Sequence, residues 1–369
     1  MKKSLSEKIY ISSTALLAVS RIMESSTLFN FSNVFYNILT VVSVFLLVLA
    51  YILIPKKEKT NDKKLYFVGF IISVLTVLGA PVYMLIAFLL YLSIKNIDVR
   101  KVIKIDIVVK AIFLCLHAVM FIIYVTSGRG MTEYVFEGLK GTGYSLLFAN
   151  PNTAGLIGTW LAMEILYIRG EKNIKSYIIP TIIAIVTFMI TASRTPFFAY
   201  ILFVFLRIIK DDKVLSVLQK IVYPILFLIS LFMVTSISYD NQFFAQANQL
   251  LSGRLSHSII AVQTAGIHFL PNILESDFFT QSSMVARLTI DNFFVRGFIQ
   301  YGIITLLLYY YFFLKVPKSA SRDSKRISII FSIYLFFEVT VAYAGFNIPL
   351  LIAMDSIRNQ RSEACEKAE

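Results

Sequence analysis

Long runs of apolar residues alternate with short polar segments along most of the chain. These runs recur between Val34 and Met354, and a helix needs roughly 20 mostly apolar residues to cross a bilayer. Each run is continuous, whereas the strands of a membrane barrel alternate in short segments. The pattern therefore predicts an all-α, polytopic transmembrane helical bundle with about 11–12 spans, which forms one integral membrane domain over residues 1–369.

The spans are predicted from the apolar runs, and the breaks between them from Gly, Pro and charged residues. The Gly79-Ala80-Pro81 break splits a run too long for one helix, because Pro cannot continue a helix interior. The basic N-terminus resembles a signal peptide but lacks a small-residue cleavage site, so we expect a retained and rather polar first span. The predicted spans are 9–23, 34–54, 65–79, 81–95, 105–126, 150–168, 176–192, 195–209, 220–238, 291–314 and 327–345, with 346–354 as a short alternative twelfth.

Composition agrees with a membrane protein. The chain is 57% hydrophobic and 15% charged, with a mean hydropathy of +0.74, whereas soluble domains carry about 25% charged residues. Its two cysteines, Cys115 and Cys365, are too few and too far apart for a disulfide framework or a metal cluster. No acidic pair or His cluster has metal-ligand spacing, so we expect neither a metal nor a cofactor.

The basic residues predict the orientation. Loops on one side of the predicted spans carry 24 Lys and Arg residues, and the other side carries 7. Cytoplasmic loops hold the excess of positive charge, so the N-terminus is expected in the cytoplasm and the chain in the cytoplasmic membrane. The net charge of +13 is scattered over short loops, whereas nucleic-acid binding needs a basic face on a folded domain.

Arginine dominates the sparse charge of the outer side. Six of the 7 outer basic residues are Arg, against 5 of the 24 inner ones. Orientation requires only positive charge, but a phosphate site favours the planar guanidinium fork. The bias indicates an anionic, pyrophosphate-bearing ligand at the outer face, and a chance bias in a small sample is the alternative.

Two external loops are unusually long, at about 127–149 and 239–290. Compact proteins rarely keep such loops without a use for them. The second loop mixes charged residues with aromatic ones, which suits a partly membrane-embedded loop beside a sugar or lipid headgroup. A connector whose apolar residues pack on the bundle is the alternative.

Three short motifs carry polar chemistry at the outer ends of predicted spans. The first, Asn150-Pro151-Asn152, opens the sixth span, where Asn150 fits a helix cap. The second is a turn that places Arg194 beside a helix N-terminus, where free N–H groups favour anions. The third, Asp291-Asn292 with Arg296 shortly after, leads into the tenth span, where an Asp and an Arg are costly unless they pair or serve a function.

These motifs, in this order, resemble the O-antigen and capsular polysaccharide polymerase (Wzy-type) family, which is related to the O-antigen ligases. Members have an Asn-Pro-Asn-like start to a middle span, a Ser-Arg turn, and a large external loop that opens near a Gly-Arg, here Gly253-Arg254. A His-Asn pair then precedes a Gly, and Asp291-Asn292 stands in its place in this chain. The resemblance runs from about 145 to 309, and the departure at position 291 leaves the role of that residue open.

The resemblance implies a metal-independent glycosyltransferase that joins polyprenyl-pyrophosphate-linked oligosaccharide repeat units at the outer membrane face, in capsule, exopolysaccharide or O-antigen synthesis. Its partners would be that lipid-linked glycan, membrane lipid and other capsule-assembly membrane proteins. The catalytic candidates are Arg194, Arg254 and Asp291. Glu275 and Asp277 are alternative bases. The candidate substrate-binding residues are Arg129, Asn152, Arg287, Asn292 and Arg296.

A transporter or flippase for lipid-linked oligosaccharide is the alternative function, because it would handle the same ligand. Transporters tend to have two related halves, and the chain shows no convincing internal repeat. Two ionisable residues, His117 and Glu338, are predicted to lie in the middle of spans, where they either serve a function or hydrogen-bond a neighbouring helix. Lys110 and Glu164 are expected near cytoplasmic helix ends, with their charged groups reaching toward water.

Overall fold

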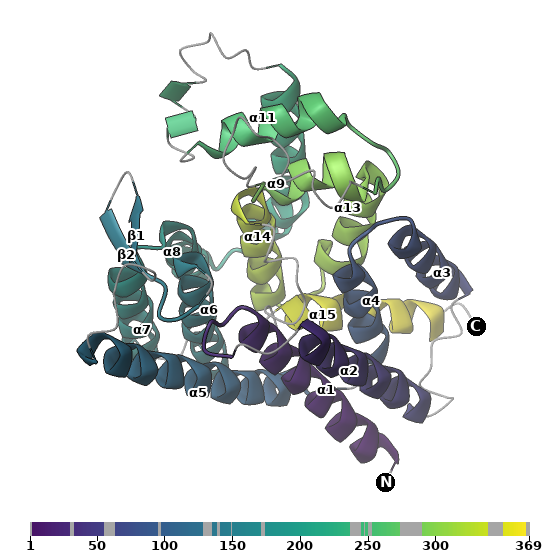
Figure 1. Cartoon of the computed structure of the whole chain (residues 1–369). Helices are drawn as coiled ribbons and strands as arrows, with labels where there is room; N and C mark the ends of the chain where they lie inside the picture. Colours follow the sequence, from purple (N-terminus) through teal and green to yellow (C-terminus); the bar gives the residue numbers. More distant parts are fainter. Residues whose placement is uncertain are drawn as a thin grey trace. The chain divides into compact units, whose positions relative to one another are not determined.

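The regular structure is almost entirely helical (Figure 1). The computed structural model describes residues 2–29, 33–54, 63–94, 97–127, 135–138, 141–148, 150–170, 174–236, 245–246, 248–249, 253–273, 290–338 and 350–366. The chain divides into two compact units. Unit 1 contains Met1–Lys59, Leu89–Asp211 and Gly345–Arg358, and unit 2 contains Thr60–Phe88, Asp212–Ala344 and Asn359–Glu369.

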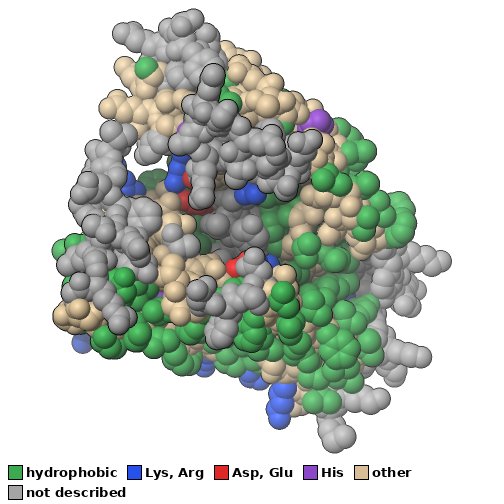
Figure 2. Space-filling model, in the orientation of Figure 1, with side chains coloured by type: hydrophobic (Ala, Val, Ile, Leu, Met, Phe, Trp, Pro, Cys, Tyr) green, Lys and Arg blue, Asp and Glu red, His purple; other side chains and the backbone are tan. Residues whose placement is uncertain are grey.

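Three of the described helices are long and apolar enough to cross a membrane: α2 (Asn33–Leu53), α5 (Val99–Thr126) and α9 (Asp212–Thr235). Shorter apolar helical stretches occur at Phe67–Val77, Val82–Ser93, Lys175–Thr191 and Ile303–Leu314. Large apolar side chains are exposed along these helices, including Ile112 on α5 and Leu228 on α9. Hydrophobic side chains also cover much of the face drawn in Figure 2. Water disfavours so much exposed apolar surface, so the chain is membrane-associated.

A ladder of serines joins the first two helices of unit 1. On α1 (Lys2–Glu24), Ser6, Ser13 and Ser20 donate hydrogen bonds to the backbone carbonyls of Ala50, Ser43 and Tyr36 on α2, with lengths of 2.8, 2.7 and 3.2 Å. Both sets of residues recur every seven positions, as expected for two antiparallel helices in coiled-coil-like contact. Small polar residues at such positions let membrane helices approach closely and hydrogen-bond, which explains why this predicted first span is rather polar.

Glycines bring the middle helices of unit 1 together. Helix α6 (Pro151–Arg169) packs on α7 (Lys175–Thr191) and α8 (Arg194–Ile208). A Cβ atom on Gly158 would lie 2.4 Å from Oγ1 of Thr187.

The expected cap at Asn150 is confirmed, because its Oδ1 accepts a 2.8 Å hydrogen bond from the Thr153 amide. Helix α5 begins at Val99, earlier than the predicted 105, because Asp98 caps it by accepting a hydrogen bond from the amide of Arg100.

The all-α prediction is confirmed, and the predicted external loop 127–149 contains one small β-hairpin. Strands β1 (Val135–Gly138) and β2 (Gly141–Tyr144) form an antiparallel hairpin with Val135 opposite Tyr144. Strand β2 contacts α7. A Cβ atom on Gly143 would lie 2.4 Å from the carbonyl oxygen of Thr191, so glycine is what permits this approach.

In unit 2 the expected Gly79-Ala80-Pro81 break is confirmed. It separates α3 (Lys63–Val77) from α4 (Val82–Ser93), and Gly79 has a φ of +111°. Helix α14 (Arg322–Phe337) packs on α9, and the first turns of the two helices are joined by Lys325, whose Nζ lies 2.7 Å from Oδ1 of Asp212. Both of these helix ends were predicted on the cytoplasmic side.

The predicted span 291–314 is not one continuous helix. It consists of α12 (Phe293–Arg296), the π-helical turn η3 (Gly297–Tyr301), α13 (Ile303–Tyr309) and the π-helical turn η4 (Tyr310–Leu314). The break lies at Gly302, whose φ of +80° strongly favours glycine. Side chains of α9 bond to carbonyls beyond the break: the Tyr223 hydroxyl donates to the Leu306 oxygen at 2.8 Å, and Gln219 Nε2 donates to the Leu314 oxygen at 3.0 Å.

Two further predictions about unit 2 are corrected. The predicted loop 239–290 contains helix α11 (Arg254–Ala265), which lies across one end of α9 (Figure 1). The predicted span 327–345 begins earlier, at Arg322, and its helix ends at Phe337, so Glu338 follows a helix rather than lying in the middle of one. The suggested twelfth segment 346–354 belongs to unit 1, and its first four residues lie outside the described part. The last five belong to α15 (Leu350–Glu366).

Candidate functional site

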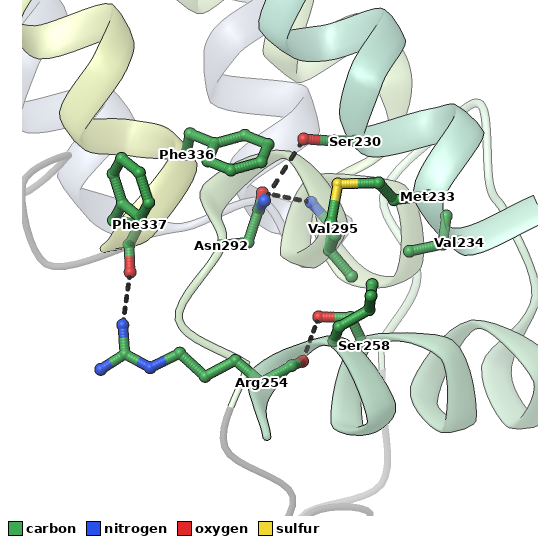
Figure 3. Close-up of a pocket in the computed structure, with 10 residues that line it drawn as sticks. Ser230, Met233, Val234, Arg254, Ser258, Asn292, Val295, Phe336 and Phe337 are labelled. Carbon is green, nitrogen blue, oxygen red and sulfur yellow. Dashed lines mark hydrogen bonds between the residues drawn. The ribbon is translucent and has the colours of Figure 1, made fainter. Parts of the chain in front are cut away.

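In unit 2, three charged residues lie close together where α11 begins. Gly253 adopts a left-handed conformation with a φ of +83°, and Arg254 is the first residue of α11. The side chain of Arg254 extends from there to the end of α14, where Nη1 donates a 3.0 Å hydrogen bond to the carbonyl oxygen of Phe337 (Figure 3). The guanidinium thereby satisfies a carbonyl that the end of a helix leaves unpaired.

Two carboxylates face the same guanidinium. Nε of Arg254 lies 3.0 Å from Oδ2 of Asp291, and Nη2 lies 3.6 Å from Oε1 of Glu338. Glu338 is buried, with only 7% of its side chain exposed, whereas Arg254 and Asp291 keep 29% and 20% of theirs exposed. The structure thus joins two predicted catalytic residues and adds Glu338, for which the sequence left open a functional role or a hydrogen bond to a neighbouring helix.

An apolar pocket adjoins this cluster (Figure 3). Its cavity measures about 30 Å³, and it is lined by Ser230, Met233, Val234, Arg254, Leu255, Ser258, Asn292, Val295, Phe336 and Phe337. Asn292 connects the pocket to the start of α12: its Oδ1 accepts hydrogen bonds from the amides of Phe294 and Val295, and its Nδ2 donates to Ser230 Oγ at 3.3 Å. The predicted substrate-binding residue Asn292 therefore serves as a helix cap.

Arg296 lies on the same short helix as the residues that Asn292 caps. Its Nε donates a 3.1 Å hydrogen bond to Oε1 of Gln300, and its guanidinium carbon lies 5.9 Å from the centre of the Tyr301 ring. Arg296 is half-buried and is not among the residues that line the pocket.

The other described candidates, Asn152 and Arg194, lie in unit 1. Ser193 donates a 3.2 Å hydrogen bond from Oγ to Oδ1 of Asn152, which ties the start of α6 to the turn before α8. Ala192 in this turn is left-handed, with a φ of +53°. Arg194 follows as the first residue of α8 with an exposed side chain, as the sequence predicted. Arg129, Arg287, Glu275 and Asp277 lie outside the described residues.

Unit 1 also holds a buried charged cluster, although two of its residues, Lys110 and Glu164, were predicted to reach water. Lys110 on α5 forms salt bridges with Asp106, at 2.5 Å from Oδ2, and with Glu164 on α6. No side chain of the three is more than 3% exposed, so Lys110 and Glu164 do not reach water. The signal in the sequence was the i, i+4 spacing of Asp106 and Lys110 within one apolar helix.

His117 on α5 is the other ionisable residue predicted in the middle of a span, and its side chain is buried. Its Nε2 lies 2.7 Å from Ser26 Oγ, its Nδ1 lies 2.7 Å from the carbonyl oxygen of Phe113, and its ring stacks on Phe148 with centroids 4.0 Å apart. A carbonyl only accepts, so Nδ1 carries a proton and donates to Phe113. His117 therefore joins three segments of unit 1 through hydrogen bonds and ring stacking.

The site and the fold together define a helical, membrane-associated protein with a polar cluster of one arginine and two carboxylates beside an apolar pocket. No protein-family model, curated protein or solved structure matches this chain.

Proposed function

We propose that this chain is a multi-pass enzyme of the cytoplasmic membrane that joins polyprenyl-pyrophosphate-linked oligosaccharide repeat units at the outer face. The observation that carries the proposal is the convergence of Arg254, Asp291 and Glu338 from three separate segments. Two of these residues were selected independently by the resemblance to Wzy-type polymerases. A polar cluster of this kind beside exposed apolar helices suits a reaction on a lipid-linked sugar.

The proposed orientation places this cluster on the outside. In unit 2 the salt bridge between Lys325 and Asp212 joins helix ends predicted to be cytoplasmic. The cluster around Arg254 joins the opposite ends of α9 and α14, which were predicted to be external. The two kinds of helix end therefore lie at opposite ends of α9 and α14, which is what the proposed orientation requires.

Arg254 would stabilise the departing pyrophosphate. Its five N–H donors form a planar fork, and three of them are directed at Asp291, Phe337 and Glu338. This support fixes the plane of the guanidinium, so that the remaining donors are preorganised for phosphate oxygens. In unit 1, Arg194 offers a separate exposed guanidinium for an anion at the start of α8.

A carboxylate would activate the acceptor. The acceptor hydroxyl oxygen forms a bond to the anomeric carbon of the donor sugar while the bond from that carbon to the pyrophosphate oxygen breaks. The hydroxyl proton passes to the carboxylate, and polyprenyl pyrophosphate leaves. Asp291 is the better base, because 20% of its side chain is exposed whereas Glu338 is 7% exposed.

A transporter of the same lipid-linked glycan is the second candidate, and the buried cluster of Asp106, Lys110 and Glu164 favours it. Ionisable groups inside membrane helices often mark transport or proton pathways. The reaction scheme above assigns no task to these three residues, so the two functions need a direct test.

Reconstitution separates the two candidates. The purified chain in liposomes should convert a lipid-linked repeat unit into a ladder of longer glycans without nucleotide sugar. Deletion of the gene should leave single repeat units on the cell surface. Movement of units across the liposome membrane with no ladder, together with loss of all surface units on deletion, would establish a flippase instead.

A further inference from the structure

We propose that residues 266–273, in the predicted external loop, form a re-entrant segment that returns into the membrane and places Phe269 and Leu270 against lipid acyl chains. The proposal rests on the membrane association of unit 2 and not on the reaction proposed above. It is carried by the backbone bonds of the segment, its depth along α9 and the apolar side chains that it exposes.

The segment pairs with the broken tenth span through its backbone. The amides of His268 and Asn272 each donate a 2.8 Å hydrogen bond, to the carbonyls of Phe298 and Gln300. In return, the amides of Ile303 and Ile304 donate to the carbonyls of His268 and Phe269, at 3.1 and 3.2 Å. These bonds lie on both sides of the break at Gly302. These bonds hold part of the non-helical backbone of the segment against protein, which is the condition for such backbone at membrane depth.

Glycine 302 permits this pairing. A Cβ atom there would lie 2.4 Å from the carbonyl carbon of Leu270 and 2.7 Å from the oxygen of Phe269. Since the φ of Gly302 is also +80°, a side chain at this position would both strain the backbone and push the segment away. The break in the span and the returning segment are therefore one structural feature.

A contact with helix α9 indicates how far the returning segment lies from the end of that helix. The Phe298 ring packs edge-on against Phe227, with centroids 5.3 Å apart. Phe227 lies eight residues before Thr235, where α9 ends, which corresponds to about 12 Å at 1.5 Å per residue. Helix α9 is one of the three helices long and apolar enough to span a membrane. The segment bonded to Phe298 is therefore held well inside the ends of that helix.

The side chains of the segment match a lipid environment. Phe269, Leu270 and Ile273 are 63%, 50% and 74% exposed, and no Asp, Glu, Lys or Arg occurs between Arg254 and Glu275. The two polar side chains contact each other within the segment, since Asn272 Nδ2 lies 3.1 Å from Nε2 of His268. In water this surface would be an exposed apolar patch, whereas in the bilayer it would meet apolar acyl chains, as the exposed Leu228 of α9 would.

Spin-label accessibility tests the proposal. In a chain with Cys115 and Cys365 replaced by Ser, nitroxides are attached to Leu270→Cys, to Leu228→Cys as the lipid-facing reference and to Lys213→Cys as the aqueous reference, since Lys213 is exposed in the first turn of α9. Collisions with oxygen and with a water-soluble nickel chelate are measured in lipid nanodiscs. The label at 270 should favour oxygen, as the label at 228 does.

Two outcomes would overturn the proposal. A label at 270 that collides with nickel as readily as the label at 213 would place the segment in water. A label protected from both reagents would place it against protein instead of lipid. If Leu270→Cys fails to fold, Phe269→Cys provides the same measurement. The polymerase reaction is not part of the readout, so failure of the proposed function would leave this result unchanged.

Discussion

Nε of Arg254 lies 3.0 Å from Oδ2 of Asp291, so the first residue of α11 is held to the first residue of the tenth predicted span. This salt bridge connects the large predicted external loop with the helical bundle of unit 2. It also joins a cationic group suited to hold a leaving pyrophosphate with a carboxylate suited to accept a proton. The pair is the centre of the proposed active site, and its two members can be tested separately.

Replacement of Arg254 by Lys should remove most polymerisation although the charge is kept. A lysine ammonium is a point charge and cannot reproduce the fork that reaches Asp291, Phe337 and Glu338 together. We expect a loss of about a hundredfold to a thousandfold in rate, as for removal of one preorganised electrostatic donor. Glycan length on gels, normalised to protein in the membrane, measures it. The exposed Arg100→Lys serves as the matched control, and normal polymer from Arg254→Lys would argue against pyrophosphate binding by this residue.

Replacement of Asp291 by Asn should abolish chain growth in a protein that still folds and inserts. Asn keeps the size and can accept a hydrogen bond from Arg254, but it cannot take a proton. Loss of a positioned general base costs about a hundredfold to ten-thousandfold in rate. Glu338→Gln provides the comparison, because Glu338 faces the same guanidinium.

The outcomes of these variants assign the role of position 291. If Asp291 only pairs with Arg254, Asp291→Asn should keep substantial activity and lower the yield of folded protein. Retained polymer in Asp291→His would indicate that Asp stands where the polymerase family that the motifs resemble has His. Normal chain lengths from Asp291→Asn, combined with a loss in Glu338→Gln, would transfer the role of base to Glu338.

Replacement of Lys110 by Met should destabilise unit 1, because it leaves Asp106 and Glu164 buried without their counterion. Breaking a buried pair in this way costs about 3–5 kcal/mol. Thermal unfolding in detergent measures the change, and Lys104→Met on the exposed face of α5 is the control. The triple variant with Asp106→Asn and Glu164→Gln should recover much of the stability. Equal unfolding temperatures for Lys110→Met and the control would contradict the buried cluster.

Removal of one rung of the serine ladder should have a smaller effect. Ser13→Ala deletes the 2.7 Å hydrogen bond to Ser43, and a hydrogen bond between membrane helices contributes about 0.6 kcal/mol on average. The combined Ser6, Ser13 and Ser20 variant should lose roughly the sum of three such terms. Ser4→Ala, at an exposed position of α1, should leave the unfolding temperature unchanged. A comparable loss in Ser4→Ala would show that helix propensity, and not the ladder, determines the effect.

The predicted orientation can be tested by labelling single cysteines in intact cells. An impermeant maleimide should label Arg129→Cys and Glu275→Cys from outside, and it should label Lys59→Cys only after the membrane is opened, because the lysine-rich loop is expected in the cytoplasm. Labelling of position 59 from outside, or none at the other two, would reverse the orientation.

Much of the helical order was predictable because bilayer spans are coded locally. Apolar runs, the Gly79-Ala80-Pro81 break and the cap at Asn150 act within a few residues, and the structure has them where the sequence indicated. The charge of the loops is likewise a local signal. The start of α5 was missed by six residues because the Asp98 cap outweighs the charges that follow it.

The sequence by itself determined the membrane-associated, helical character of this protein and nominated Arg254 and Asp291. Only the tertiary structure decided that these two residues pair, that Glu338 joins them, and that Lys110 lies buried between two carboxylates. It also decided that the tenth span breaks at Gly302 to receive the segment around Leu270. The physical reason is range: hydropathy and helix propensity act along the chain, whereas ion pairs and backbone bonds between segments depend on which distant residues the fold brings together.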